Sequence, residues 1–507
     1  MGKIVTGEQF REIKQRFRGK KTGLCHGVFD LVHPGHLAHF KEAKSVCDIL
    51  VVSLTAAKYV RKGPDRPYFD DEMRLEFLES IECVDFVMLS NDFTPDDVIE
   101  CVRPDFYFKG EEYSVSENDV TGMIDKEVGL VREYGGDVYY TTGETFSSTK
   151  LINKGLCALP EKVLDFSDRF IRHYSIESVK TYSDRAKNLK VLVIGDVIID
   201  RYTYCAVQGL MSKDMGYSVR FQEEEEFLGG SVAIARQLAA FSDHVTLCSV
   251  IGTQQELYDR FRQELGGLMT LELVRSPAYS TIVKHRYLEK DKKRDDLRKI
   301  FAINNIPESV RMENQTEQGF QNKIRELIGG FDVVFLCDYG HGLISEETIK
   351  IIQDQAAFLV LNCQTNSTNY GMNLITKYTK ADLFTLDQKE LKLAYPYCDM
   401  DEKEALARLG EHLGCSGWLT RGSSGAYALE GQKIMECPAF VLKVIDTIGA
   451  GDAFFSIAGL FSAAGASVEL GMFMGNIAGA LACNIVGNER SIEKPDILKY
   501  ASTLLNV

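Results

Sequence analysis

The segment that most constrains the fold of this chain is Gly27–His36, with the sequence Gly-Val-Phe-Asp-Leu-Val-His-Pro-Gly-His. Residues 20–26 before it form a short strand-like run, and the residues after it place apolar side chains at helical spacing. The segment therefore predicts a strand, a tight turn and a helix, with His33 and His36 at the helix N-terminus. Unpaired backbone N–H groups and the helix dipole favour an anion there, and Gly35 lets the backbone approach that anion closely.

The histidines around this turn have two other interpretations. His26, His33, His36 and His39 are either a chance cluster of surface and core residues or the ligands of a metal ion. A metal site is the weaker interpretation, because no cysteine or carboxylate stands at the usual ligand spacings. Taken with the preceding Gly-Val-Phe-Asp, the pattern resembles the GxFDxxHxGH signature of the nucleotidyltransferase family that includes the cytidylyltransferases.

The composition predicts two globular domains with small-molecule partners. The 507 residues exceed what one ordinary core holds, and 45% hydrophobic with 26% charged residues is typical of a folded protein. A net charge of -15 argues against nucleic acid and against a polybasic membrane patch. The 13 scattered cysteines without a C-x-x-C motif indicate reduced thiols, and neither a signal segment nor a membrane-spanning run stands out. We therefore expect a cytoplasmic protein.

The first 156 residues alternate between strand-like and helix-like segments. Apolar runs at 48–54, 86–89 and 105–108 predict buried strands, and residues 70–80 and 95–102 have the spacing of helices. This alternation predicts a parallel sheet with crossover helices, and ligands of such sheets bind beyond the carboxyl ends of the strands. We expect a Rossmann-like domain over residues 1–156.

Three loops in this domain add cations and hydroxyls at strand ends, namely residues 62–67, 109–113 and 147–152. Alone, the hydroxyls of the third loop suit simple helix capping as well as phosphate binding. Together with the histidine motif, the order of these loops resembles the nucleotidyltransferase half of the bifunctional heptose-7-phosphate kinase and heptose-1-phosphate nucleotidyltransferase. The resemblance implies that His33 and His36 act on the phosphates of a nucleoside triphosphate. It also implies that the following residues bind the nucleotide or its phosphates: Gly27, Phe29, Lys62, Lys109, Ser148 and Thr149.

The sequence predicts a helical connector over residues 157–188. It predicts a second three-layer α/β domain over residues 189–507. Strand-like runs at 190–196 and 332–340 each contain a carboxylate at or near the end, and another run follows at 358–362. The connector is rich in charge and is not a Gly/Ser linker, so we expect a preferred arrangement of the two domains.

The second domain centres on residues 446–454, with the sequence Asp-Thr-Ile-Gly-Ala-Gly-Asp-Ala-Phe. The small residues form an anion-binding nest at a helix start, where Asp452 is placed to take a proton from a substrate hydroxyl. A turn with a carboxylate that satisfies the helix dipole is the plainer alternative. The string resembles the DTxGAGD signature of ribokinase-type (PfkB) sugar kinases.

That resemblance extends over most of residues 190–500 and implies a ribokinase-like fold. It implies Asp452 as the catalytic base, and Glu390 as the residue that helps to hold Mg²⁺, through a water molecule. Its implied nucleotide and phosphate residues are Thr420, Gly422, Gly425, Gly449, Ala450 and Gly451. Its implied substrate residues are Asp200, Gly229, Gly230 and Asp338.

The sequence departs from the family pattern at three positions. Asp387 replaces the Asn of the NxxE motif, Ala233 replaces an Asn that usually binds a sugar hydroxyl, and His341 replaces a Lys common in heptose kinases. The order of the two domains is also reversed relative to the heptose enzyme. The catalytic loop is intact, so phosphoryl transfer is a firmer expectation than the identity of the acceptor.

These resemblances imply a bifunctional enzyme of nucleotide-sugar biosynthesis. The kinase uses ATP and Mg²⁺ on a sugar phosphate similar to heptose 7-phosphate. The first domain joins a sugar 1-phosphate to a nucleotide from ATP or CTP. The alternatives are another phosphorylated sugar or a polyol with CTP as donor, a kinase of different specificity, or a kinase domain that only binds ligand or serves as a scaffold. By analogy, a homo-oligomer is expected.

Overall fold

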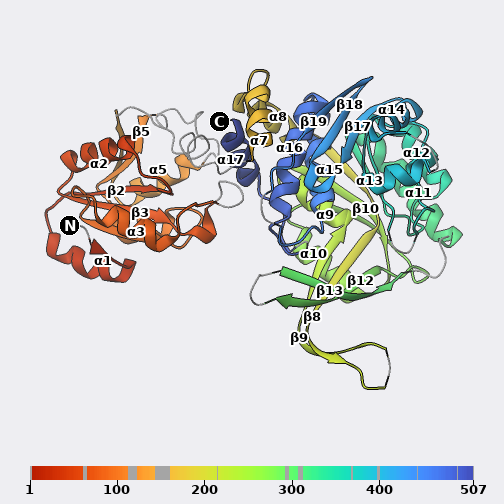
Figure 1. The fold of residues 1–507 in the computed structure, drawn as a ribbon, viewed down its shortest axis with the longest axis horizontal. Coiled ribbons are helices and arrows are strands. Elements are labelled where there is room, and N and C mark those ends of the chain that lie inside the picture. The colour runs from red at the N-terminus through yellow and green to blue at the C-terminus, as the bar shows by residue number, and fades with distance from the viewer. Residues whose placement is uncertain are drawn as a thin grey trace. The chain divides into compact units, whose positions relative to one another are not determined.

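The computed structural model describes residues 3–60, 66–111, 123–142, 160–213, 215–291, 296–306, 312–366, 369–396, 400–441, 444–487 and 489–505. The chain divides into two compact units, residues 1–171 with 498–507 and residues 172–497 (Figure 1). Lys62, Ser148 and Thr149 lie outside the described residues. Within the described ranges, no helix is both long enough and apolar enough to cross a bilayer.

The first unit is built on a six-stranded parallel sheet in the order β1-β4-β3-β2-β5-β6. The strands are β1 (Lys3–Ile4), β2 (Thr22–Gly27), β3 (Ile49–Thr55), β4 (Phe86–Ser90), β5 (Phe106–Gly110) and β6 (Asp137–Thr141). The helices are α1 (Gly7–Lys14), α2 (Pro34–Val46), α3 (Asp71–Glu79), α4 (Asp96–Val102), α5 (Ile124–Glu133) and α7 (Glu161–Phe170). Strand order reverses between β2 and β5, which marks their carboxyl ends as the ligand crevice.

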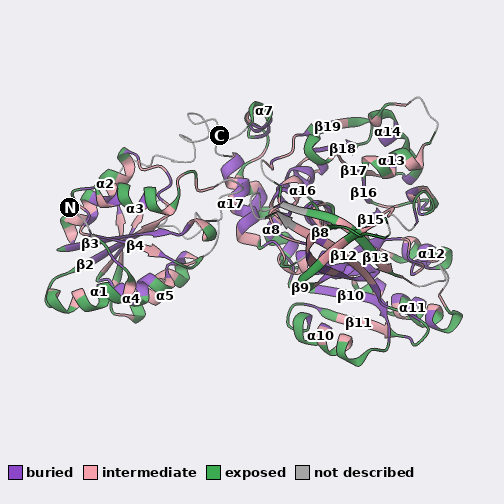
Figure 2. Cartoon of the chain, turned by 60° about the horizontal axis from the view of Figure 1, so that its bottom comes forward, coloured by how far each residue is buried: buried purple, intermediate pink, exposed green. Residues whose placement is uncertain are grey.

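Helices cover both faces of this sheet, because its central strands are apolar on both sides. Leu24 of β2 packs in the same cluster as residues of α1, α4 and α5, whereas its neighbour Cys25 packs in a second cluster with residues of α2 and α3. Successive side chains of a strand point to opposite faces, so one run supplies both cores. Figure 2 shows these buried strands between helices whose outer faces are exposed.

The second unit contains a nine-stranded sheet in the order β11-β10-β7-β14-β15-β16-β17-β18-β19, parallel as far as β17. Its strands are β7 (Lys190–Gly195), β10 (His244–Ile251), β11 (Thr270–Arg275), β14 (Val333–Asp338), β15 (Leu359–Cys363), β16 (Leu383–Asp387), β17 (Ser416–Thr420), β18 (Ala426–Glu430) and β19 (Lys433–Cys437). The order reverses between β7 and β14, so the crevice of this sheet lies at their carboxyl ends.

Helices again form the outer layers. They are α8 (Ile176–Lys187), α9 (Ser231–Ala239), α10 (Gln255–Leu265), α11 (Asn314–Leu327), α12 (Glu346–Gln355), α13 (Gln388–Ala394), α14 (Glu402–Leu413), α15 (Ala450–Ala463) and α16 (Val468–Ala482). The last helix, α17 (Lys494–Leu505), begins in this unit and ends in the first. Residues of α11, α12 and α14 share one large core cluster with the strands. On α15, Gly459 lies against Phe335 of β14, where a Cβ would come within 2.7 Å of that ring.

A four-stranded sheet, the small sheet, accompanies the large one in the order β13-β12-β8-β9. It consists of β8 (Val197–Leu210), β9 (Tyr217–Gly230), β12 (Ile282–Asp291) and β13 (Asp296–Asn305). β8 follows β7 after a single residue, Asp196, so the small sheet begins at the crevice of the large one. Figure 1 shows β8 and β9 extending together away from the helices.

The predicted α/β architecture is confirmed for both units. The expected strands 48–54 and 86–89 appear as β3 and β4, and the predicted connector contains the two helices α7 and α8. Local capping supports several of the predicted helix starts. For example, the Asp70 side chain accepts the backbone N–H of Met73 at the start of α3.

Candidate active sites

The first candidate site lies at the carboxyl ends of β2 and β5, on the two sides of the crevice. Cys25 of β2 pairs with Phe108 of β5, so the residues that follow each of them are neighbours. β2 ends at Gly27 and β5 at Gly110, and α2 begins seven residues after Gly27. The strand, turn and helix predicted around the two histidines therefore surround the crevice.

His33 and His36 are held by the backbone of this turn. His33 is the N-cap of α2, and its Nδ1 accepts the Gly35 N–H at 3.1 Å. The Nδ1 of His36 accepts the His33 N–H at 3.3 Å, and the ring centroids lie 3.9 Å apart in a stack. Burial lowers the pKa of His33, and a neutral ring whose Nδ1 accepts carries its proton on Nε2. Both rings therefore carry Nε2–H donors beside a helix N-terminus, and the Nε2 of His33 is buried.

Gly27 and Phe29 support the histidine pair. Phe29 has a φ of 46°, and its ring packs edge-on against His36 at 5.3 Å and against Phe40 at 5.2 Å. A Cβ on Gly27 would lie 3.0 Å from the Phe29 ring. Gly27 therefore lets the Phe29 ring close over the strand end, and that ring fixes the position of His36.

Lys109 is held close to the same strand end by a carboxylate that the sequence analysis missed. Its Nζ lies 2.7 Å from a carboxylate oxygen of Glu127 on α5, and the two side chains are only 13% and 12% exposed. The Tyr107 hydroxyl donates to the same carboxylate at 2.8 Å. The helical spacing of α5 was readable from the sequence, but its pairing with β5 was not.

The remaining histidines of the cluster are neutral and bonded to hydroxyls. His26 bonds to Ser53 at 2.8 Å through Nδ1, and His39 bonds to Thr141 at 2.7 Å through Nδ1. Burial, followed by the charge of Lys109, lowers the pKa of His26 to about 3 and that of His39 to about 4. Both rings therefore lie close to Lys109. No metal-binding group of three or more ligating side chains occurs among the described residues, so the metal interpretation has no support there.

Asp30 and Arg66 belong to the motif and to the loop 62–67 described in the sequence analysis, but neither residue was assigned a role there. Asp30 accepts the Arg66 Nε at 2.8 Å and the backbone N–H of Tyr68 at 2.7 Å, and it is 4% exposed. Within the described part of the chain, Nη2 of Arg66 is buried without a hydrogen-bond partner. The position of Asp30 inside the motif and of Arg66 in a turn-rich loop was the available signal.

The second candidate site is centred on Asp452 in the first turn of α15. Gly449, the N-cap, has a φ of 82°, which glycine adopts without strain. The Asp452 carboxylate accepts the Gln364 Nε2–H at 2.9 Å and the Tyr339 hydroxyl at 3.4 Å. Burial raises the pKa of Asp452 to about 6, against the bond from Gln364. A carboxylate with a pKa near the working pH suits a general base.

Ala450 and Gly451 follow Gly449 as the first two residues of α15, next to Asp452. The first N–H groups of a helix have no intrahelical partner. The Ala450 N–H donates to the Thr447 carbonyl at 3.4 Å, and anion binding by this turn stays a prediction. Gln364 and Tyr339, which follow β15 and β14 directly, are residues that the sequence analysis missed. Their positions at strand ends were the available signal.

Asp338 ends β14 and is engaged on all sides by protein donors. Its carboxylate pairs with Lys377 at 2.5 Å and accepts the Tyr378 hydroxyl at 2.7 Å and the Gly340 N–H at 2.9 Å. It is 2% exposed. Asp338 therefore holds together the chain segments that follow β14 and β15.

Asp200 and the glycine pair lie where the small sheet begins. Asp200 of β8 pairs with Arg286 of β12 and is 4% exposed. Gly229 and Gly230 at the end of β9 pair with Ile198 and Val197 of β8. Gly230 has a φ of 61°, and a Cβ there would lie 2.5 Å from the Asp196 carbonyl oxygen, so only glycine fits. The structure thus brings Asp200 and both glycines to the carboxyl end of β7.

Glu390 lies at the carboxyl end of β16, on the first turn of α13. Its carboxylate accepts the backbone N–H of Thr365 at 3.0 Å and that of Asp387 at 2.8 Å. Asp387 in turn accepts the Glu390 N–H at 2.8 Å as the N-cap of α13. Asp387, which stands where the family pattern has Asn, therefore caps α13 in this chain. Burial, and then the charge of Asp387, raises the pKa of Glu390 to about 7.

This carboxylate fits Mg²⁺ only in part. Each Glu390 oxygen already accepts a backbone N–H, which leaves lone pairs for a bound water rather than a full ligand shell. A divalent cation nearby would offset the repulsion between the Glu390 and Asp387 carboxylates, which helps to raise the pKa of Glu390. The donor set therefore fits Mg²⁺ held through water.

The nucleotide-side loop follows β17, the neighbour of β16. Thr420 pairs with Asp387 across the two strands, which brings the loop next to α13. Gly422 and Gly425 have φ values of 53° and 91°, and a Cβ on Gly425 would come within 2.0 Å of the Cys437 carbonyl oxygen. The two glycines therefore set the tight course of this loop beside the carboxyl edge of the sheet.

Two departures from the family pattern, Ala233 and His341, follow closely after residues that the resemblance assigns to the substrate, Gly230 and Asp338. Ala233 is buried on α9 and has no polar side-chain atom. Burial lowers the pKa of His341 to about 4. Its Nε2 is buried and, among the residues that the structure describes, accepts or donates no hydrogen bond. A neutral imidazole with an open bonding position replaces the family's lysine.

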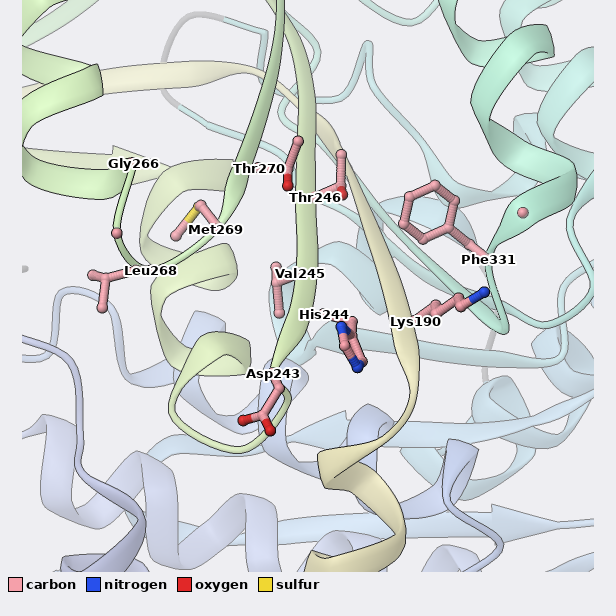
Figure 3. Close-up of a pocket in the computed structure, with 12 residues that line it drawn as sticks. Lys190, Asp243, His244, Val245, Thr246, Gly266, Leu268, Met269, Thr270 and Phe331 are labelled. Carbon is pink, nitrogen blue, oxygen red and sulfur yellow. The ribbon is translucent and has the colours of Figure 1, made fainter.

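A separate pocket of about 420 Å³ lies at the amino ends of the strands (Figure 3). Lys190, His244 and Thr270, which begin β7, β10 and β11, line it. The candidate residues above follow the carboxyl ends of their strands, so this pocket is not the site that they form.

The geometry can be compared with known protein families. The model of the pfkB family of carbohydrate kinases matches residues 188–495, more than half of the chain. The chain belongs to the pfkB family. The cytidylyltransferase-like family model matches residues 24–154, which hold the histidine turn. The predicted pairing of these two kinds of domain is confirmed.

Curated relatives resemble only the first domain. The bifunctional protein HldE of Paramagnetospirillum magneticum is 39% identical over 142 residues, 27% of this chain and 27% of that protein. HldE of Geobacter metallireducens is 36% identical over 151 residues, 29% of each chain. The chain thus spans little more than a quarter of the length of the curated relatives that it matches.

The fold of the second unit is known from solved structures. Phosphofructokinase-2 of Escherichia coli, in complex with substrates and products, superimposes with a TM-score of 0.50 at 15% identity. The match covers 62% of this chain and 99% of that chain. The ribokinase-like fold expected for this unit is therefore confirmed.

Proposed function

We propose that this chain is a bifunctional enzyme of nucleotide-sugar biosynthesis. The second domain phosphorylates a sugar phosphate similar to heptose 7-phosphate with ATP, and the first transfers a nucleotidyl group to a sugar 1-phosphate. The observation that carries the proposal is that one chain holds two helix N-termini, each at a sheet crevice. The first of them carries His33 and His36, and the second carries Asp452. The domain limits that we propose are 1–156, 157–188 and 189–507.

In the first domain, an oxygen of the sugar 1-phosphate attacks the α-phosphorus of the nucleoside triphosphate, and the bond to pyrophosphate breaks. The nucleophile is already anionic, so the reaction needs no general base. The Nε2–H donors of His33 and His36 bind phosphate oxygens on which charge increases, and Lys109 adds a positive charge. Fixed donors of this kind act through electrostatic stabilisation of the transition state. We assign Lys62, Ser148 and Thr149 to the same phosphates by resemblance.

In the second domain, Asp452 accepts the proton of the acceptor hydroxyl while the oxygen attacks the γ-phosphorus of ATP. Gln364 and Tyr339 orient the carboxylate by donating to it. The N–H groups at Gly449, Ala450 and Gly451 bind the transferring phosphoryl group at the start of α15. Asp200 and the glycine pair at 229–230 bind the acceptor sugar, and Asp338 orders the wall of that pocket.

We further propose that Mg²⁺ binds near Glu390 through water and screens the charge of ATP when present. Thr420, Gly422 and Gly425 contact the nucleotide from the neighbouring loop. The nucleotidyl donor is ATP or CTP, and the chain acts as a homo-oligomer. Light scattering of the purified protein tests the last point.

The function is tested by mass spectrometry of the products formed from ATP, CTP or GTP with a panel of phosphorylated sugars. His36→Ala should lower pyrophosphate release by roughly 10²-fold or more, because it removes a transition-state donor. Asp452→Asn should abolish sugar phosphorylation without changing pyrophosphate release. The exposed His244→Ala and Asp354→Asn are matched controls that should leave both rates unchanged.

Each half of the proposal has its own refutation. Wild-type pyrophosphate release in His36→Ala contradicts the assignment of the first domain. Failure of every acceptor with the wild-type kinase domain, with ATP bound, favours a domain that binds ligand without catalysis. Equal phosphorylation by the Asp452→Asn chain contradicts the assigned base.

A further inference from the structure

The small sheet carries two cations to the acceptor side of the kinase site. On β12, Lys284 lies directly beside Asp200 of β8, and Arg286 follows two residues later. Residues two apart on a strand point to the same face, so both cations face the side of Asp200. Neither residue belongs to the sequence motifs of the family described above.

The two cations differ in their partners. Arg286 is neutralised by Asp200, with which it forms a close ion pair. A third cation of this region, Lys377, is paired with Asp338 at 2.5 Å. The Lys284 side chain, by contrast, forms neither an ion pair nor a hydrogen bond with any residue in the described ranges, and it is partly buried beside the Tyr339 ring. A partly buried ammonium without a partner indicates an anionic ligand.

The surroundings of Lys284 indicate where that ligand lies. Its Nζ lies 5.8 Å from the centre of the Tyr339 ring, and the Tyr339 hydroxyl bonds to Asp452. Burial lowers the pKa of Lys284, and Asp200, Asp196 and Asp452 oppose that lowering. The ammonium is therefore close to the catalytic carboxylate, where the acceptor oxygen and the phosphoryl group meet.

A second observation supports an open position for a ligand. His341 follows β14, and its buried Nε2 finds no hydrogen-bond partner among the described residues. The charge of Lys284, after burial, helps to lower the pKa of His341, so the two groups are near each other. An unsatisfied buried nitrogen beside an unpaired ammonium is a costly arrangement unless a polar ligand joins them.

We propose that Lys284 binds the phosphoryl group during its transfer from ATP to the acceptor, so that the small sheet supplies a catalytic cation. This inference rests on the proposed kinase function. Asp452 takes the hydroxyl proton, the acceptor oxygen bonds to the γ-phosphorus, and the bond from that phosphorus to the β–γ bridging oxygen breaks. ADP leaves with the bonding electron pair. Lys284 stays protonated and donates to a γ-phosphoryl oxygen throughout.

The test compares Lys284→Met with Lys299→Met in the full chain. Lys299 is an exposed lysine on β13 of the same sheet, so its loss changes the net charge equally. Calorimetry measures the affinity for MgADP alone and with tetrafluoroaluminate, which mimics a phosphoryl group in transfer. In the wild type and Lys299→Met, tetrafluoroaluminate should tighten MgADP binding. Lys284→Met should keep the affinity for MgADP and lose that tightening.

With any acceptor that the product assay identifies, Lys284→Met should lower kcat by roughly 10²- to 10³-fold with little change in the KM for ATP. Lys284→Arg, which keeps the charge, should recover part of that loss. All variants share an unaltered first domain, so nucleotide bound there contributes equally to every titration. Thermal unfolding of each variant shows whether it is folded, and Lys284→Arg serves as the second variant if Lys284→Met is not.

The outcomes separate this inference from the kinase assignment. If tetrafluoroaluminate tightens MgADP binding equally in Lys284→Met, the role of Lys284 is wrong and the kinase function stands. If it tightens binding in none of the chains, the inference is likewise overturned. If the full wild-type chain does not bind MgADP at all, the kinase function itself fails.

Discussion

Asp196 links β7 to the small sheet, and its burial makes the stability of the second unit depend on pH. The side chain is fully buried, and its Oδ2 accepts no hydrogen bond from the residues that the structure describes. Asp338 follows the neighbouring strand at the same level, since Gly195 pairs with Cys337. Burial, followed by the charge of Asp338, raises the pKa of Asp196 from 3.8 to about 7.

The sign of the effect follows from proton binding. Between about pH 4 and 7 the folded protein keeps this proton and the unfolded chain releases it, so the free energy of unfolding falls as the pH rises. Above pH 7 the carboxyl must be buried as an anion, and the full loss is present. At about 1.4 kcal/mol per pH unit, the total loss is roughly 4 kcal/mol, of which roughly 2.5 kcal/mol falls between pH 5 and 8.

Asp196→Asn removes the titration and keeps the size and polarity of the side chain. The variant should therefore gain roughly 2.5 kcal/mol of unfolding free energy relative to the wild type when the pH is raised from 5 to 8. Urea titrations at both pH values measure this difference. The fluorescence of Trp418, the single tryptophan of the chain, reports unfolding of the second unit, because that residue is fully buried on β17.

Asp354→Asn is the matched control, since Asp354 is exposed on α12 of the same unit. It should change the unfolding free energy by a similar small amount at both pH values. The reasoning is refuted if the difference between Asp196→Asn and the wild type is the same at pH 5 and pH 8. It is also refuted if the wild type is more stable at pH 8 than at pH 5 while the Asn variant is not.

Three further predictions concern the two sites. Gln364→Leu removes a hydrogen bond to the Asp452 carboxylate that is worth roughly 1.5–3 kcal/mol and that lowers its pKa. The acid limb of the kcat/KM profile should therefore move upward from near pH 6 by about 1–2 pH units. An unmoved limb contradicts the assignment of Asp452 as the base that Gln364 orients. Glu127→Gln removes the carboxylate charge that pairs with Lys109, so KM for the nucleoside triphosphate should change more than twofold while pyrophosphate release persists, and unchanged kinetics exclude a positioning role. Arg74→Met should lower the free energy of unfolding of the first unit by about 3–5 kcal/mol, because its buried guanidinium donates to three backbone carbonyls, which the variant leaves without this donor, and to a carboxylate; calorimetry measures this loss.

Much of the architecture was predictable because it depends on local pattern. Apolar runs of strand length between helical segments predict a parallel sheet with covered faces, and β2 to β5 follow that prediction. The two motifs also place His33 and Asp452 at helix starts, because the glycines and prolines that allow such turns are adjacent in the sequence. The predicted roles of the site residues remain predictions.

The partners of those residues were not predictable. Glu127 meets Lys109 only because α5 packs against the edge where β5 ends, and Gln364 meets Asp452 only because β15 is the neighbour of β14. Strand order depends on how whole layers bury apolar surface, and no local pattern states it. The ion pair of Lys377 with Asp338 and the hydrogen bond from the Tyr378 hydroxyl to Asp338 likewise depend on the tertiary packing.

The sequence by itself thus determined where the chain can turn a strand into a helix that binds an anion, since that property needs only neighbouring residues and the helix dipole. Only the tertiary structure decided which charges meet there and which remain unpaired. Burial keeps His33 neutral and raises the pKa of Asp452. The pairing of the strands places Lys284 where its side chain has no counterion among the described residues.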